Sequence, residues 1–360
     1  MSTQPTSGPT PNEPAANDSE TTEEVLPSTE ELAALKARAI SAPLLTDIYT
    51  ADPSAHVFEG KVYIYPSHDI DAGSAFDDEG GHFGMVDYHV LCQDSPESPA
   101  QDCGVALHVR DVPWADRQMW APDAASQDGR FYLYFPAKRA DGRFQIGVAE
   151  SDRPAGPFTA EALPIEGGYS IDPAVFADHD GHQYLYFGGL WGGQLQKYRD
   201  NVYADEHVEP QDDEPALGAR VARLHRDMKQ LAEPTREVVI LDEQGQPLRA
   251  GDHERRYFEG PWLHTHAGKY YFSYSTGNTH LLCYAIGDNP YGPFSYQGVI
   301  LTPVLGWTTH HSIVQVQGKW YLYYHDSLHS GGVTHLRTVK VTELHHDEHG
   351  HIQTIHPYGE

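Results

Sequence analysis

One short phrase recurs five times along the chain, and this recurrence constrains the fold more than any other feature. Each copy begins with a turn glycine and continues with alternating aromatic and aliphatic residues. The copies are GKVYIYPSHD at Gly60, GRFYLYFPAK at Gly129, GHQYLYFGG at Gly181, GKYYFSYS at Gly268 and GKWYLYYHD at Gly318. Such alternation after a glycine turn is typical of a hairpin strand. The intervals of 50 to 87 residues suit propeller blades with variable loops. The pattern therefore predicts an all-β fold, a five-bladed β-propeller, and disfavours a β-sandwich with chance repetition.

Two shorter segments are expected before the propeller, which we assign to residues 43–360. Residues 1–27 are acidic and rich in Pro, Ser and Thr, which predicts a disordered tail. Residues 28–42 are expected to form a short helix that packs on the body. Ser28 and Glu31 have the spacing of a capping box at its start.

Composition limits the partners of the chain. The formal net charge is −28 at pH 7, which disfavours nucleic acid and anionic membranes as partners because both would be repelled. A neutral substrate or a salty environment is compatible with this charge. No apolar run is long enough to span a membrane, and no secretory signal is visible. We therefore expect a cytoplasmic location, where Cys92 and Cys103 would be reduced thiols despite their short separation.

A second pattern lies eight or nine residues before each repeat glycine. These positions hold Asp52, Trp120, Asp172, Glu259 and His310. If the strand before each hairpin is the innermost of its blade, all five side chains converge at the propeller axis. Three converging acids repel one another and are costly to bury. One Asp-Pro dipeptide alone could simply start a strand, but three acids in the same phase of a repeat indicate an acid–base enzyme.

Glycoside cleavage needs this combination of carboxyl groups. One carboxylic acid must stay protonated beside the leaving oxygen while another is ionised. Glu259 is followed by Pro261 and Trp262 and preceded by Phe258, and apolar surroundings raise the pKa of a carboxyl group. Glu259 is therefore the candidate acid. The residues alone do not decide which aspartate is the base.

The ordered set of motifs resembles glycoside hydrolase family 43, whose members are five-bladed propellers. The resemblance covers about residues 43–345 and rests on five short motifs. These are Asp52-Pro53-Ser54, Trp120-Ala121-Pro122, Asp172-Pro173, Glu259-Gly260-Pro261-Trp262 and His310-His311-Ser312. It implies an inverting mechanism in which Asp52 is the general base, Glu259 the general acid and Asp172 the modulator of the Glu259 pKa.

The resemblance also implies binding residues. A Ca²⁺ ion on the axis would have His310 as its metal ligand, the alternative being a histidine that only hydrogen-bonds. Trp120, His311 and Arg337 are the expected substrate contacts. For Trp120 the alternative is a plug in the channel wall, and for Arg337 a surface charge on an outer strand.

The expected activity is exo-acting release of pentoses, β-D-xylose or α-L-arabinofuranose, from oligosaccharides derived from hemicellulose. An endo-arabinanase or a galactan exo-hydrolase of the same fold is the alternative within the family. A propeller that binds glycans without cleaving them is the alternative outside it.

Overall fold

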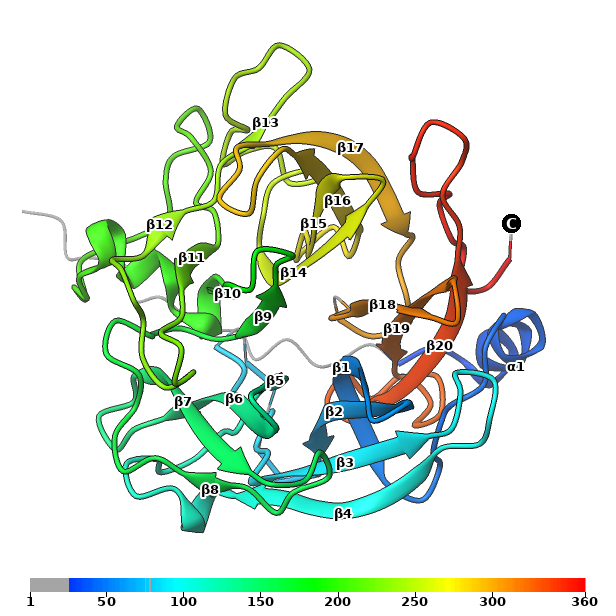
Figure 1. Cartoon of the computed structure of the whole chain (residues 1–360). Helices are drawn as coiled ribbons and strands as arrows, with labels where there is room; N and C mark the ends of the chain where they lie inside the picture. Colours follow the sequence, from blue (N-terminus) through cyan, green and yellow to red (C-terminus); the bar gives the residue numbers. More distant parts are fainter. Residues whose placement is uncertain (1–25, 75, 78, 308, 360) are drawn as a thin grey trace, which may run out of the picture.

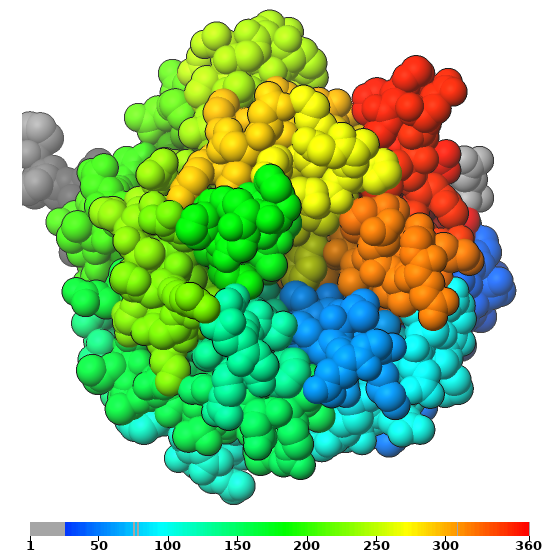
Figure 2. Space-filling view, viewed as in Figure 1, coloured from blue at the N-terminus to red at the C-terminus, as the bar shows by residue number. Residues whose placement is uncertain are grey.

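Five sheets surround one axis in the computed structural model of the chain (Figure 1). The structure describes residues 26–74, 76–77, 79–307 and 309–359. The predicted tail lies almost wholly outside these residues. Within them the sheets are the blades of a five-bladed β-propeller, which confirms the predicted fold class. The blades follow one another around the ring in chain order, as the colour sectors of Figure 2 also show.

The first two blades contain four strands each. Blade one consists of β1 (Tyr49–Phe58), β2 (Lys61–Asp69), β3 (Asp87–Gln93) and β4 (Gln101–His108). Blade two consists of β5 (Asp123–Gln127), β6 (Arg130–Lys138), β7 (Phe144–Ser151) and β8 (Thr159–Ala160).

The remaining blades differ in size. Blade three consists of β9 (Ala174–Ala177), β10 (Gln183–Phe187), β11 (Arg220–Arg223) and β12 (Arg236–Glu237). Blade four consists of β13 (Ile240–Leu241), β14 (Glu259–His266), β15 (Lys269–Ser275), β16 (Leu282–Gly287) and β17 (Phe294–Leu301). Blade five consists of β18 (Ser312–Val316), β19 (Lys319–Asp326) and β20 (Thr338–Leu344). Short 3₁₀ turns lie between strands: η1 (Val109–Asp111), η2 (Trp191–Gly193), η3 (Leu195–Lys197) and η4 (Arg199–Asn201).

The recurrent glycine has a conformational reason. In the first hairpin Phe58 pairs with Lys61, so Glu59 and Gly60 form a two-residue turn. Both turn residues have positive φ, 52° and 79°, as a type I′ turn requires, and glycine adopts this conformation at little cost. This turn matches the twist of the flanking strands. The turn therefore fixes the pairing register of β1 with β2. β1, the strand before the glycine, is the innermost strand of its blade.

The two ends of the propeller meet through backbone hydrogen bonds. The N–H of Leu44 donates to the carbonyl of Val339 at 2.8 Å, and the N–H of Thr50 donates to that of Arg337 at 2.9 Å. The first bond joins the segment before β1 to β20, and the second joins β1 itself to the residue just before β20. These bonds close the ring.

The helix α1 (Thr29–Arg38) precedes this closure and lies beside β20 in Figure 1. Ser28 and Glu31 form the predicted capping box, because each side chain accepts a hydrogen bond from the other residue's N–H. No helix among the described residues is long and apolar enough to cross a membrane.

The expectation of reduced thiols at Cys92 and Cys103 is wrong, because the two residues form a disulfide. Cys92 lies in β3 and Cys103 in the neighbouring strand β4. Irregular pairing between these strands brings the two Cα atoms to 6.2 Å, within the range that a disulfide can bridge. The disulfide therefore joins two strands of blade one.

Candidate active site

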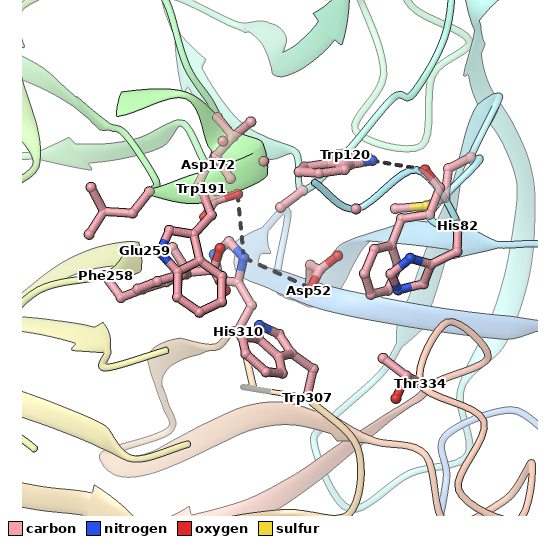
Figure 3. A pocket seen from close by; sticks show the side chains of 18 of the residues that line it. Asp52, His82, Trp120, Asp172, Trp191, Phe258, Glu259, Trp307, His310 and Thr334 are labelled. Atoms are coloured by element: carbon pink, nitrogen blue, oxygen red, sulfur yellow. Dashed lines mark hydrogen bonds and ion pairs between the residues drawn. The ribbon is translucent and has the colours of Figure 1, made fainter. Parts of the chain in front are cut away.

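A cavity of about 780 Å³, including its open mouth, lies on the axis at the N-terminal ends of the innermost strands. Its lining includes all five residues that the repeat register places at the axis (Figure 3). These are Asp52, Trp120, Asp172, Glu259 and His310. Each comes from a different blade. The structure therefore brings the predicted set to one place.

Local backbone irregularities aim the acids into this cavity. Asp52 has a φ of 51°, and the pairing of β1 with β2 shifts register between Ala51 and Ser54. Asp172, just before β9, has a φ of 58°. In blade four the register shifts between Glu259 and Trp262. Pro53 and Pro261 lie within the two register shifts, where a proline cannot donate to the strand ladder, and Pro173 directly follows Asp172. Positive φ at aspartate is strained and is typical of functional sites.

Asp52 is held as an anion. Its Oδ1 accepts from Nη1 of Arg337 at 2.9 Å, and its Oδ2 accepts from Oγ of Ser67 at 2.7 Å. Burial alone would raise the pKa of Asp52, but the charge of Arg337, the nearby imidazoles and the Ser67 hydrogen bond outweigh burial and lower this pKa to about 2. A carboxylate that is ionised throughout the working pH range is suited to accept a proton from water.

The pKa values of Glu259 and Asp172 are shifted in the opposite direction, upward. Burial and the charge of Asp52 raise the pKa of Glu259 to about 8. Burial and the charges of Glu259 and Asp52 also raise the pKa of Asp172, although the N–H of Gly260 donates to its Oδ2 at 2.9 Å. Because two close buried carboxyls resist joint ionisation, this pair retains a proton at neutral pH. The site thus holds an ionised Asp52 beside a pair of acids, Asp172 and Glu259, that keeps a proton.

Comparison with known proteins places the chain in a family. The family model "Glycosyl hydrolases family 43" matches residues 101–352. The chain belongs to glycosyl hydrolase family 43. It is a glycosidase, as the arrangement of acids predicts.

Close relatives are known from sequence and structure. A Bacteroides ovatus protein named xylosidase/arabinosidase is 59% identical over 308 residues, covering 85% of this chain and 95% of that protein. A crystal structure of a GH43_1 enzyme from Xanthomonas citri is 67% identical, with a TM-score of 0.89, and covers 92% of this chain and 98% of that one. That enzyme was also solved with xylotriose. A β-xylosidase/α-arabinofuranosidase from a compost metagenome, in complex with xylotriose and described as a calcium-free form, is 61% identical. Its TM-score is 0.88, and the match covers 89% of this chain and 98% of that one.

His310 faces two of the acids. Its Nδ1 lies 4.0 Å from Oδ1 of Asp52 and 3.9 Å from Oδ1 of Asp172. Burial lowers the pKa of His310, so the imidazole is neutral and able to bind a cation. Among the described residues, these side chains are not close enough to form a three-residue metal cluster. A Ca²⁺ ion here would therefore have His310 as one protein ligand and water as most of the others.

The three expected substrate contacts occupy different environments. Trp120 lines the cavity, and its Nε1 donates to the carbonyl of Phe83 at 2.9 Å. Arg337 also lines the cavity, but its guanidinium is bound to carboxylates and is not an outer-strand surface charge.

His311 does not reach the cavity. It is 1% exposed, and its Nε2 lies 2.6 Å from Oγ of Ser273. Neighbouring residues of an extended strand point to opposite sides, so His311 turns away where His310 turns inward. Its position does not support the expected substrate contact.

Sequence reasoning missed much of the cavity wall. Part of this wall comes from the described residues of the connection between β2 and β3, and part from the turns after β10. The large aromatic and imidazole side chains that these and neighbouring loops contribute include Phe76, His82, Phe83, Trp191 and Trp307. These loops carry no repeat pattern. Clustered glycine and aromatic residues in 70–86 were the one available signal.

Asp69 was missed as well. It is 2% exposed, and its carboxylate accepts from Nε and Nη2 of Arg337, each at 2.8 Å. Asp69 thus lies behind the arginine that contacts Asp52. The repeats contain a signal for it, because the first and fifth copies of the phrase both end in Asp. The second of these, Asp326, binds the buried Lys340 at 2.6 Å.

Proposed function

We propose that the protein is an inverting, exo-acting glycosidase that releases β-D-xylose or α-L-arabinofuranose from oligosaccharides. One observation carries this proposal: three acids converge in one cavity, and their pKa values are shifted in opposite directions. The names of the Bacteroides ovatus and compost enzymes, and the xylotriose in two related crystal structures, support pentose-containing substrates.

In the proposed reaction Glu259 donates its proton to the glycosidic oxygen as the bond to the anomeric carbon breaks. Asp52 accepts a proton from a water molecule, whose oxygen attacks that carbon from the opposite face. The products are a free sugar of inverted configuration and a shortened oligosaccharide. Asp172 is proposed to keep a proton available on Glu259, because the two buried carboxyls resist joint ionisation.

The wall of the cavity supports sugar binding. Trp191 and Trp307 lie with ring centroids 5.9 Å apart, and aromatic rings provide apolar faces for a sugar ring. Trp120 is proposed to contact the sugar from another side. A hydrated Ca²⁺ ion next to His310 is part of the proposal, since the calcium-free description of a relative implies a calcium-containing form. When bound, such an ion would add positive charge that favours anionic carboxylates.

The test is hydrolysis of aryl β-D-xyloside and aryl α-L-arabinofuranoside by the wild type and by Asp52→Asn. Loss of a general base typically costs about 10²–10⁴-fold in rate. Asp152→Asn is the matched control, because the Asp152 side chain is 75% exposed. It should retain full activity.

Product stereochemistry tests the mechanism separately. Proton NMR during hydrolysis of the β-xyloside should show α-xylose first, before mutarotation. Initial formation of β-xylose would refute inversion. Turnover of arabinan or galactan oligosaccharides without turnover of either aryl pentoside would favour the alternative activities.

A further inference from the structure

Blade one carries a second cluster of ligand-type side chains outside the cavity. One ligand atom from each of His68, Asp87 and His89 lies within 4.8 Å of the other two. In the part of the chain that the structure describes, no other group of three His, Cys, Asp or Glu residues is this close. None of the three lines the cavity. The proposed glycosidase chemistry therefore does not account for them.

Strand register produces this cluster. β2 and β3 are antiparallel, with Ser67 opposite Tyr88, so the next residues, His68 and Asp87, are cross-strand neighbours. His89 lies two residues beyond Asp87 and therefore on the same face of β3. Two adjacent strands thus present three ligand side chains to one side of the sheet. Their side chains are 14–18% exposed, so a small ion can reach them from solvent.

A fourth residue, Asp102, orients one of the three ligand side chains. Nδ1 of His89 lies 2.9 Å from Oδ2 of Asp102 in β4. When Nδ1–H donates to this carboxylate, the lone pair of the ring is on Nε2. A carboxylate that orients an imidazole in this way is typical of metal-binding histidines. The Cys92–Cys103 disulfide joins the same two strands next to Asp102. Both strands are thus held in place.

We propose that His68, Asp87 and His89 form a site for a divalent transition-metal ion, with Zn²⁺ as the best match. Two imidazoles and one carboxylate are ligands that Zn²⁺ prefers, and water would complete a tetrahedral set. Ca²⁺ and Mg²⁺ prefer oxygen-rich sites. Zn²⁺ binds these ligands at about 2.0–2.2 Å, so the side chains must close slightly around the ion.

The contacts within the cluster indicate what a bound metal would replace. There Nδ1 of His68 and Oδ1 of Asp87 are 2.7 Å apart, and the ring centroids of His68 and His89 are 4.5 Å apart. The metal would replace the contact between His68 and Asp87 with a link between β2 and β3. This link lies beside Asp69, which contacts Arg337. The site is therefore structural in character and distinct from the axis.

The first experiment is calorimetric titration of the chelator-treated full chain with Zn²⁺. The prediction is one equivalent bound at micromolar or lower Kd, with a rise of several degrees in Tm at saturation. His89→Gln and Asp87→Asn should each weaken binding at least tenfold. Two variants are used so that the test still stands if one of them misfolds. Circular dichroism of each variant checks its fold.

Two controls separate this site from other histidines. His310→Ala removes the axial histidine, and His349→Gln/His351→Gln removes two exposed histidines near the C-terminus, whose side chains are 72% and 55% exposed. Both controls should keep the tight equivalent. A zinc-soaked crystal should show an anomalous peak between His68, Asp87 and His89. The proposal is overturned if folded His89→Gln and Asp87→Asn bind Zn²⁺ as the wild type does, or if the wild type binds none.

Discussion

Arg337 contacts Asp52 through two nitrogens, Nη1 to Oδ1 at 2.9 Å and Nη2 to Oδ2 at 3.2 Å. The two residues come from opposite ends of the chain and meet where blade five closes on blade one. On its other side the guanidinium binds Asp69. Paired hydrogen bonds of this kind fix both orientation and charge. Asp69 is therefore a positioning residue that acts on Asp52 through Arg337.

Asp69→Asn tests this role. Without the second carboxylate, Arg337 should be less firmly held, and it should orient the Asp52 carboxylate less firmly. We expect kcat to fall by at least about tenfold, with a smaller change in KM. The pKa of Asp52, about 2 in the wild type, should stay low, because the change also removes a negative charge that repels the Asp52 anion, so the loss of kcat should come without a new acidic limb. A purely structural role would lower Tm and leave kcat of the folded variant unchanged.

The raised pKa of Glu259 predicts an alkaline limb in the activity. Its pKa is about 8, so the general acid is protonated below that pH and loses its proton above it. We expect kcat/KM to fall as pH rises through about 8. Glu259→Gln should abolish this limb on an aryl glycoside whose leaving group needs no protonation. An unchanged alkaline limb in that variant would assign the limb to another group.

The His310 environment predicts a response to chelation. Its neutral imidazole faces Asp52 and Asp172 at 4.0 and 3.9 Å. If a hydrated Ca²⁺ ion binds there, EDTA should lower the activity several-fold and added Ca²⁺ should restore it. His310→Ala should be insensitive to both treatments. Full activity of the wild type in EDTA, with no calcium bound by elemental analysis, would argue against the ion.

The axial acids could be predicted because they follow the periodicity of the fold. The turn at Gly60 fixes hairpin register, and register carries Asp52 to the axis in phase with Asp172 and Glu259. Because neighbouring residues of an extended strand point to opposite sides, His311, next to His310, points away from the cavity. The expected substrate contact of His311 came from the motif resemblance, without applying the alternation of strand residues.

The cavity wall could not be predicted, because its shape depends on contacts between loops from different blades. Gly192 illustrates this. A Cβ at this position would lie 2.5 Å from the carbonyl oxygen of Glu79 and 3.3 Å from the Trp120 ring. A loop of blade three thus approaches loops of blades one and two at a distance that only glycine permits. The Cys92–Cys103 disulfide similarly depends on an irregular strand pairing that no sequence motif marks.

Asp123, the first residue of β5, is predicted to stabilise the axis and not to take part in catalysis. It is 1% exposed and does not line the cavity. Its carboxylate accepts from the hydroxyl of Ser54 and from the N–H of Val175 at 2.5 Å, and Nε2 of His56 lies 2.6 Å away. Asp123 therefore connects the innermost strands of blades one, two and three.

Asp123→Ala would leave these groups buried without their acceptor, and each such loss costs about 1–3 kcal/mol. We expect the free energy of unfolding, measured by urea denaturation, to fall by at least about 2 kcal/mol. Asp152→Ala, at an exposed position, should change it by less than about 0.5 kcal/mol. At urea concentrations below its unfolding transition, the Asp123→Ala enzyme should remain folded. Its activity should still fall as pH rises through about 8, because the acids of the cavity do not contact Asp123. Equal stability of the two variants would show that the inner strands do not depend on this carboxylate.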